Sequence, residues 1–356
     1  MSTRGTTLVL VGTYTNTGSE GIYLFQLDDG NDALTPAGVC GGISNPSYLA
    51  VHPSEKFVYA VSEGGADSQV VALRLEHDKP ALEIINSQPA HGTSPCHVTV
   101  DATGRCVMSA NYGDGSAVAF PVREDGSLAE VGTVIRHEGS SAHPTRQTGP
   151  HAHSVTLDPG NRHAYIADLG IDRVMIYDLD PTAAKLTPAS TPWAQVPPGE
   201  GPRHFAFHPA GRYAYLLTEL GNTVIVFAHD AVTGALEPLQ SLPSLPPDFA
   251  GTSYGADIQV DPRGEFVYAS NRGHDSLVVY SVDGATGMLT LRSFAPSGGR
   301  NPRGFGIAAG GELLLVANQD SDNIVAFRLN RAQGTLEPTG AVTSVPRPVC
   351  VKLVSS

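Results

Sequence analysis

The sequence predicts an all-β fold built from repeated units. One phrase recurs six times, with successive copies about fifty residues apart, and the copies begin at His52, Asp101, Asp158, His208, Asp261 and Ala308. Each copy is a turn rich in proline, glycine and acidic or amide residues, followed by a strand of β-branched and aromatic residues, as in "DPRGEFVYASNR". No segment of useful length has helical periodicity, which disfavours α/β folds.

The segments around each phrase predict the architecture. A short strand precedes the phrase, such as "HVTVD" at 97–101, and a third strand follows it, such as "TVIVFAH" at 223–229. A weaker fourth strand comes next, such as "LTLRSF" at 289–294. Four short antiparallel strands per unit make a propeller blade. A pair of β-sandwiches is disfavoured because sandwiches do not repeat one phrase six times.

The two ends of the chain hold the pieces of a seventh blade. "LVLVGTYT" at 8–15 and "GIYLFQLD" at 21–28 match the second and third strands of the unit, and "RPVCVKLV" at 347–354 matches the first. If the ends share one blade, the ring closes and no sheet edge is left free. We therefore expect residues 1–356 to form a single seven-bladed β-propeller domain, with four antiparallel strands per blade.

Composition limits the partners. The net charge of -13 argues against nucleic acid and anionic membranes, so an anionic ligand needs a local positive cluster. Cys40, Cys96, Cys106 and Cys350 have no CxxC spacing, which predicts buried thiols in a reducing compartment. The apolar run near the N-terminus is too short for a signal sequence, and no stretch approaches a membrane span. We therefore expect a cytoplasmic protein.

Polar residues gather where the blades should meet the central channel. The first two strands of a blade are antiparallel, so the start of the first and the end of the second lie at the same end of the blade. The starts carry His97, His153, Arg203, His204 and Asp257, and the ends carry Glu63, Asn111, Asp168, Glu219, Arg272 and Asn318. This set is more polar than packing requires, and it predicts a binding site in the channel mouth.

Structural roles are open for several of these residues. His97 and His204 could form hydrogen bonds between blades. Asn111, Asp168 and Asn318 could cap turns with their side chains. Arg203 and Glu219 could form an ion pair that holds one blade together.

The connection at 136–154, "RHEGSSAHPTRQTGPHAHS", is long enough to reach over the mouth. It carries His137, His143, Arg146 and His151. Several histidines also fit a metal, but no metal-ligand spacing is present, and Arg203 and Arg272 at the same mouth would repel a cation. We expect neither a metal nor another cofactor. "GTSYG" at 251–255 fits the GxSxG pattern, yet it leads into a strand instead of a helix, so a serine hydrolase is not expected.

Several phrases resemble one known family. "RQTGPHAHSVTLDP", "GPRHFAFHP", the "LLTE" that ends in Glu219, and "SNRGHDS" are similar to the seven-bladed β-propeller lactonase family. That family includes the propeller type of 6-phosphogluconolactonase and the related fungal 3-carboxy-cis,cis-muconate cycloisomerase. The resemblance extends from Val11 to the final "VANQDSDNIVAFRL". It implies hydrolysis of a sugar lactone, 6-phosphogluconolactone to 6-phosphogluconate, in the pentose phosphate pathway of carbohydrate metabolism.

The resemblance also implies site residues. The catalytic constellation proposed for the cycloisomerase branch, one histidine, two arginines and a glutamate, matches His153, Arg203, Arg272 and Glu219. Either His153 or Glu219 could act as the base. His151, Arg146 and Gln147 are similar to the bacterial lactonase branch, which favours hydrolysis. The expected substrate-binding residues are His151, Arg146, His97, His204, Asn111, Asp168 and Asn318.

Two other functions fit the same sequence. A cycloisomerase would use the same four residues to hold a dicarboxylate and protonate carbon. A propeller that only binds a partner protein would show a broad apolar patch on one face. For the lactonase we expect a small anionic lactone as ligand, no nucleic acid or membrane partner, and a monomer or homodimer.

Overall fold

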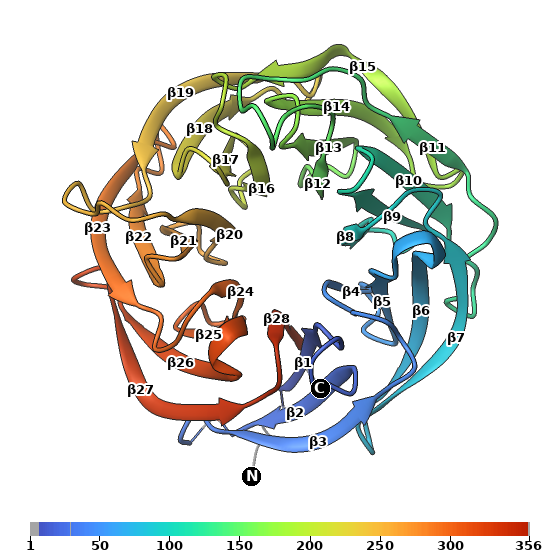
Figure 1. Ribbon diagram of the computed structural model, residues 1–356, viewed down its shortest axis with the longest axis horizontal. Helices are drawn as coiled ribbons and strands as arrows, with labels where there is room; N and C mark the ends of the chain where they lie inside the picture. Colours follow the sequence, from blue (N-terminus) through green and yellow to red (C-terminus); the bar gives the residue numbers. More distant parts are fainter. Residues whose placement is uncertain (1–6, 29, 355–356) are drawn as a thin grey trace.

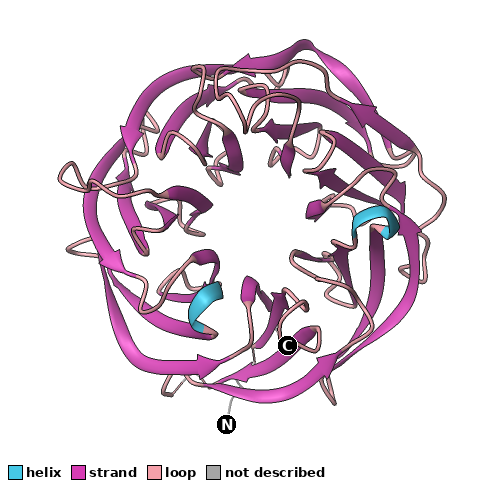
Figure 2. Ribbon diagram, in the orientation of Figure 1, coloured by secondary structure: helices cyan, strands magenta, loops and turns pink. Residues whose placement is uncertain are grey.

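The computed structural model describes residues 7–28 and 30–354, and its strands form seven four-stranded antiparallel sheets arranged in a ring (Figure 1). The sheets radiate from the centre of the ring, and two short 3-10 helices, η1 (Gly65–Asp67) and η2 (Gln319–Ser321), lie between strands (Figure 2). The predicted seven-bladed β-propeller is confirmed. None of the described helices is long and apolar enough to cross a membrane.

The blades are numbered in chain order and their strands run from the channel outward. Blade 1 contains β4 (Leu49–Val51), β5 (Phe57–Ser62), β6 (Gln69–Glu76) and β7 (Ala81–Pro89); blade 2 contains β8 (Pro95–Val100), β9 (Cys106–Asn111), β10 (Ser116–Pro121) and β11 (Thr133–Arg136). Blade 3 contains β12 (Ala152–Leu157), β13 (His163–Asp168), β14 (Arg173–Asp180) and β15 (Lys185–Gln195); blade 4 contains β16 (Pro202–Phe207), β17 (Tyr213–Thr218), β18 (Thr223–His229) and β19 (Leu236–Pro243). Blade 5 contains β20 (Tyr254–Val260), β21 (Phe266–Arg272), β22 (Ser276–Val282) and β23 (Leu289–Pro296); blade 6 contains β24 (Pro302–Ile307), β25 (Leu313–Asn318), β26 (Asn323–Asn330) and β27 (Thr335–Ser344).

Blade 7 joins the two ends of the chain. It contains β28 (Pro348–Val354), β1 (Leu8–Thr13), β2 (Ile22–Leu27) and β3 (Leu34–Cys40). β28 pairs with β1 in antiparallel register, with Leu8 opposite Val354 and Leu10 opposite Lys352. The predicted closure by the terminal strands is therefore confirmed, and it pairs the inner edge of β1 that would otherwise be open. The extent of the domain, residues 1–356, stays a prediction.

The hydrophobic core lies between neighbouring blades. Each apolar cluster takes side chains from two facing sheets; the one between blades 3 and 4, for example, contains Tyr165, Phe205 and Phe227. Burying one such large side chain stabilises the fold by about 1.5–3 kcal/mol. The alternation of strand residues sends one set of side chains to each neighbouring blade, so every sheet is covered on both faces.

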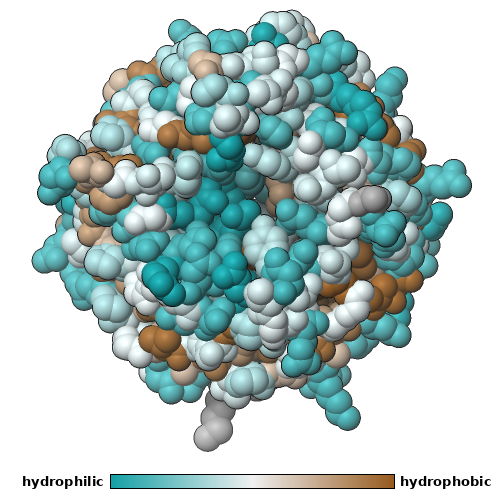
Figure 3. Space-filling view, viewed as in Figure 1, coloured by the Kyte–Doolittle hydropathy of each residue, from teal (hydrophilic) through white to brown (hydrophobic). Residues whose placement is uncertain are grey.

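A recurring irregularity shapes the channel. In the inner strands of several blades the register skips one residue, and the skipped residues are Cys96, His153, Arg203, Arg303 and Val349. A β-bulge of this kind re-aims the side chain of the extra residue. All five skipped residues line one small cavity at the channel mouth. The same face is hollowed at its centre, and hydrophilic residues surround the hollow (Figure 3).

Candidate active site

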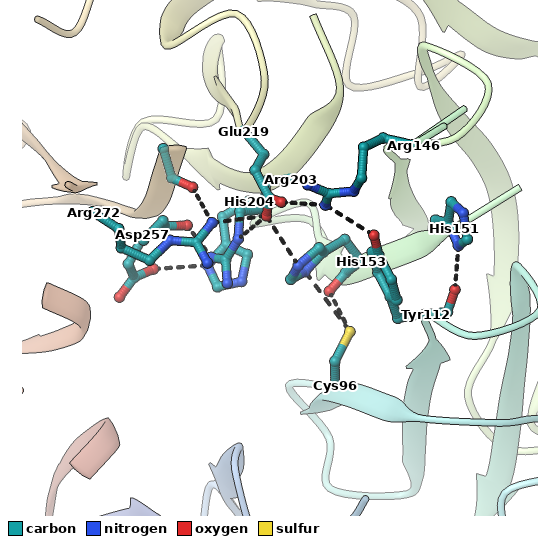
Figure 4. A network of polar contacts seen from close by, with 12 residues as sticks. Cys96, Tyr112, Arg146, His151, His153, Arg203, His204, Glu219, Asp257 and Arg272 are labelled. Carbon is teal, nitrogen blue, oxygen red and sulfur yellow. Dashed lines mark hydrogen bonds and ion pairs between the residues drawn. The ribbon is translucent and has the colours of Figure 1, made fainter. Parts of the chain in front are cut away.

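Glu219 lies at the centre of a polar network in the channel mouth (Figure 4). It directly follows β17, and only 5% of its surface is exposed. Its Oε2 atom accepts hydrogen bonds from Arg203 Nε at 3.0 Å and pairs with Arg272 Nη2 at 2.9 Å, and its Oε1 atom accepts from Arg146 Nη2 at 2.5 Å. Burial alone would raise the pKa of Glu219, but Arg272 and Arg203 outweigh burial and hold that pKa well below its usual value. Glu219 is therefore a carboxylate balanced by three guanidinium groups.

His153 lies beside this carboxylate. The bulge at the start of β12 places its Nε2 atom 3.7 Å from Glu219 Oε2 and its Nδ1 atom 3.7 Å from Cys96 Sγ. Its side chain is 5% exposed. Burial, and then the nearby charge of Arg203, lower the pKa of His153 well below its usual value. The imidazole is thus neutral at neutral pH and can accept a proton.

The two predicted arginines are anchored to the same stretch of backbone. Arg203 Nη1 donates to the carbonyl of Ala256, and Arg272 Nη2 donates to the carbonyl of Gly255 at 2.9 Å. Arg203 is 2% exposed, whereas the Arg272 side chain is 14% exposed. Burial lowers the pKa of both groups, but a guanidinium begins so high that it stays charged at neutral pH. Arg272 is the one more open to a ligand.

The structure thus brings the four predicted catalytic residues into one network from three blades. His153 comes from blade 3, Arg203 and Glu219 from blade 4, and Arg272 from blade 5. Their catalytic roles stay predictions.

The long connection before β12 contributes Arg146 and His151 to the mouth. Arg146 Nη2 bonds to Glu219 and also to the hydroxyl of Tyr112, at 3.0 Å. His151 Nδ1 lies 2.7 Å from the Tyr112 carbonyl oxygen, and the two rings stack with centroids 4.6 Å apart. Gln147 holds this loop in place by donating to the carbonyl of Leu169. Tyr112 therefore links both loop residues to blade 2.

His97 and His204 lie on the next level of the channel. Their ring centroids are 5.5 Å apart, and the His204 ring is also 5.5 Å from that of His153. His204 Nδ1 lies 2.9 Å from Asp257 Oδ1. Burial lowers the pKa of His97 well below its usual value, and burial and Arg203 lower that of His204 to about 4. Both histidines also line a cavity of about 520 Å³ that extends along the inner strands.

Asn111, Asp168 and Asn318 have partners in the connections that lead from the preceding blade into their own. Asn111 Nδ2 donates to Ala90 O, and Asn318 Nδ2 donates to Ser297 O. Asp168 accepts hydrogen bonds from the backbone of His151 and Gly170 and pairs with His137 Nδ1 at 2.6 Å. Their assignment to substrate binding stays a prediction.

Strand geometry explains the different environment of these three residues. Each is the last residue of its second strand, whereas Glu219 comes one position after the last residue, Thr218. Tyr112 has the same place after Asn111. Because successive strand residues point to opposite sides, this offset of one decides which side chain faces the channel. The sequence analysis treated the last residue of the second strand and the residue after it as one position, the strand end.

The residues of the mouth that sequence reasoning missed include Tyr14, Cys96, Tyr112 and Arg303. A signal existed for Arg303, because it occupies in "NPRGFG" the place that Arg203 has in "GPRHFA". Its guanidinium lies 5.4 Å from the centre of the Tyr14 ring. Cys96 is near His153, but burial and the charge of Glu63 raise its pKa to about 12, so the thiol stays protonated and is a poor nucleophile.

Two cavities adjoin the network. The first, about 10 Å³, is lined by His153, Arg203, Arg303, Cys96 and Tyr14 among others, and it has about the volume that one water molecule needs. A second, of about 640 Å³, adjoins Arg272 and is lined also by Tyr254, Asn301, Arg300 and Arg347, with Asp275 and Asp320 at its wall. Arg347 Nη1 pairs with Asp320 Oδ1 at 2.7 Å and Arg272 Nη2 with Glu219 Oε2 at 2.9 Å, so carboxylates balance two of the three guanidinium groups around this cavity.

No donor set for a metal is found at the mouth among the described residues. Within residues 7–28 and 30–354, a group of three His, Cys, Asp or Glu side chains close enough to share an ion occurs only at Asp158, His163 and His229.

Comparison with known proteins identifies relatives along nearly the whole chain. Residues 8–353 match the model of the family described as lactonase, 7-bladed beta-propeller. The 6-phosphogluconolactonase of Bacillus subtilis is 37% identical over 344 residues, which cover 97% of each chain.

Solved structures agree in shape. The putative 6-phosphogluconolactonase of Bacteroides fragilis superimposes with a TM-score of 0.93 and 34% identity, covering 99% of both chains. The periplasmic gluconolactonase of Pseudomonas aeruginosa also has a TM-score of 0.93 and 34% identity, covering 98% of this chain and 99% of the other. These two relatives differ in whether the lactone in their names carries a phosphate.

Proposed function

The chain belongs to the seven-bladed β-propeller lactonase family, and we propose that it hydrolyses 6-phosphogluconolactone to 6-phosphogluconate in the channel mouth. The observation that carries the proposal is the neutral, buried His153 beside a cavity of about 10 Å³ and the carboxylate of Glu219. The groups needed for lactone opening, a base, a water position and positive charge for the carbonyl oxygen, lie together there.

His153 is the base in this proposal. Both oxygens of Glu219 are already engaged, Oε2 by Arg203 Nε and Arg272 Nη2 and Oε1 by Arg146 Nη2, so this carboxylate is poorly placed to take a proton. Burial also lowers the pKa of His153, but its Nε2 atom lies 3.7 Å from Glu219 Oε2, outside hydrogen-bond distance, and can take a proton. It takes a proton from the water that attacks the lactone carbonyl carbon. Glu219 Oε2, 3.7 Å away, then stabilises the imidazolium that forms.

The arginines stabilise the developing negative charge. Attack of water turns the carbonyl oxygen into an oxyanion, and Arg272 and Arg146 are the partly exposed guanidinium groups that can reach it. Arg203, which is buried, orients Glu219. The tetrahedral intermediate collapses by breaking the bond to the ring oxygen, which takes the proton from His153 as it leaves. The products are a carboxylic acid and a hydroxyl group, and His153 is neutral again.

The phosphate would occupy the cavity of about 640 Å³ next to Arg272. Arg300 and Arg347 line that cavity. A single guanidinium group can donate two parallel hydrogen bonds to two oxygens of a phosphate. A lactone ring held at Arg272 can extend its C6 phosphate toward them. This arrangement supports a phosphorylated over a plain sugar lactone.

The proposal also covers the cofactor requirement, the ligand, the compartment and the oligomeric state. The reaction uses no cofactor, the ligand is a small anionic lactone, and the enzyme acts in the cytoplasm on the pentose phosphate pathway as a monomer or homodimer. The periplasmic relative shows that a similar structure also serves another compartment.

A direct assay tests the proposal. Purified protein is added to freshly generated 6-phosphogluconolactone, to glucono-lactone and to carboxymuconate, and acid release or absorbance is followed against the uncatalysed rate. We expect rapid opening of the phosphorylated lactone. Turnover of carboxymuconate alone would favour the cycloisomerase, and turnover of none would favour a binding protein.

A further inference from the structure

A second polar cluster lies at the far end of β12 from His153. Asp158 follows that strand, and it meets His163 from β13 and His229 from β18. Asp158 and His163 are each 3% exposed and His229 is 9% exposed. One donor atom from each residue lies within 4.8 Å of one from each of the others. The cluster therefore joins blade 3 to blade 4 in the interior.

The propeller repeat shows that both histidines are exceptions. His229 donates its backbone N–H to the carbonyl of Arg212, the residue just before β17. The same bond in the other blades identifies the equivalent residues, which are Leu27, Leu75, Val122, Leu179, Val282 and Leu329. The first residue of the second strand, equivalent to His163, is Leu8, Phe57, Cys106, Tyr213, Phe266 or Leu313. Every other blade has an aliphatic residue at the first position and an apolar, aromatic or thiol residue at the second.

These two positions face each other across every boundary between blades. Leu8 and Leu75 belong to one hydrophobic cluster, as do Phe266 and Leu329, and Leu313 and Leu27. Only the boundary between blades 3 and 4 has two imidazoles there. Packing between blades does not require them, because the other boundaries are filled by aliphatic, aromatic and thiol side chains.

Asp158 is also exceptional among its equivalents. Its Oδ1 atom accepts the backbone N–H groups of Arg162 and His163, as Asp101 and Asp261 do in their turns. The second oxygen of Asp101 accepts from Asn161, and that of Asp261 accepts from Arg331. The Oδ2 atom of Asp158 is buried and has no described hydrogen-bond partner. A buried, unpaired carboxylate oxygen is costly unless a cation is close.

The hydrogen bonds of the histidines leave lone pairs for that cation. His163 Nε2 lies 3.4 Å from Asp178 Oδ1, while its buried Nδ1 has no described hydrogen-bond partner and faces Asp158 Oδ2 at 3.8 Å. His229 Nδ1 lies 2.6 Å from the Gly211 carbonyl and donates to it, so Nε2 carries a lone pair. Tyr165 Oη lies 2.8 Å from this Nε2 atom and also 2.8 Å from Gly234 O. When its single proton is donated to the Gly234 carbonyl, the lone pair of His229 Nε2 is left for the ion. Metal-binding histidines commonly donate their second N–H to a carbonyl or carboxylate in this way.

We propose that Asp158, His163 and His229 bind a divalent transition-metal ion, with zinc as the best fit, and that this ion joins blades 3 and 4. Two imidazoles and one carboxylate are a ligand set typical of zinc, with water at the fourth position. Donors on a tetrahedral zinc ion are about 3.5 Å apart, so the ion draws the three side chains together by about 1 Å. The site lies a full strand away from Glu219, so the ion takes no part in the proposed reaction and the proposal does not depend on that reaction.

The test measures metal binding by the untagged full chain. Protein stripped with a chelator is titrated with Zn²⁺ by calorimetry and with Co²⁺ by visible absorbance, which reports imidazole and oxygen coordination. We expect one equivalent of metal and a higher melting temperature for the loaded protein. His163→Phe and His229→Leu introduce residues found in other blades, so they should keep the fold, checked by circular dichroism. Each should weaken Zn²⁺ binding by more than about 100-fold.

His77→Ala, which removes a histidine outside the cluster, is the matched control and should bind one equivalent. The proposal is overturned if the stripped wild type takes up no metal, or if both cluster variants bind as the wild type does. If a cluster variant does not fold, Asp158→Asn and anomalous diffraction from wild-type crystals soaked in Zn²⁺ decide: a peak between the three side chains supports the site, and its absence refutes it.

Discussion

Glu219 Oε2 lies 3.7 Å from His153 Nε2, while Arg203 and Arg272 approach the same oxygen at 3.0 and 2.9 Å. The two guanidinium groups thus form ion pairs with this oxygen of Glu219, whereas the His153 imidazole lies outside normal hydrogen-bond distance of it. We therefore expect the imidazole to act as the base, because the arginines already engage the carboxylate.

Replacement of His153 should remove the base. We expect His153→Ala to lower kcat on 6-phosphogluconolactone by a factor of about 10² to 10⁴, because positioned acid-base groups contribute that much. His77→Ala is the control, since it removes a distant imidazole. Turnover of His153→Ala at the wild-type rate would refute the role.

Replacement of Glu219 should reduce stability as well as activity. Glu219→Gln leaves Arg203 buried without its anion, and loss of one partner from a buried ion pair costs about 3–5 kcal/mol. The free energy of unfolding in urea measures this. An unchanged value would mean that the arginines have other counter-charges.

Replacement of Cys96 should have little effect on chemistry. Its thiol, with a pKa raised to about 12, is protonated at neutral pH, so we expect Cys96→Ala to keep kcat within a few-fold of wild type. Steady-state kinetics checks this. A loss near that of His153→Ala would indicate a thiolate nucleophile instead.

The cavity beside Arg272 should decide the preference for phosphate. We expect the double variant Arg300→Ala with Arg347→Ala to raise KM for 6-phosphogluconolactone at least about tenfold, because charge-assisted hydrogen bonds contribute about 1.5–3 kcal/mol each. KM for glucono-lactone should change little. Calorimetry with 6-phosphogluconate and gluconate gives an independent comparison; an equal rise of both KM values would mean that the cavity does not hold the phosphate.

Acid should destabilise the protein over a defined pH range. The folded-state pKa of His97, His153 and His204 is lowered, so below about pH 6.5 the unfolded chain binds more protons than the folded one. The stabilisation that these neutral histidines give above that pH is therefore lost as the pH falls. For His204 the loss continues until the pH reaches its folded-state pKa of about 4. The melting temperature of the wild type should fall between pH 7 and pH 4. That of the His204→Gln variant should fall less steeply over the same range. A parallel decline in both proteins would exclude His204 as a contributor.

The sequence by itself determined the ring. The repeated turn-and-strand phrase predicted the blades, the unmatched ends predicted their closure, and family resemblance selected His153, Arg203, Glu219 and Arg272. Those inferences depend on residue type and spacing along the chain. Both survive into the structure because six of the seven blades are built from consecutive residues and the seventh from the two ends of the chain.

Only the tertiary structure decided which polar residues face one another. A strand reverses its side chains at every step, and a bulge in the inner strands shifts that alternation by one, so Asn111 and Tyr112, or Thr218 and Glu219, cannot be told apart by spacing alone. Contacts between blades join residues far apart in sequence, such as His163 with His229. Their meeting depends on the packing of two sheets, which no local pattern records.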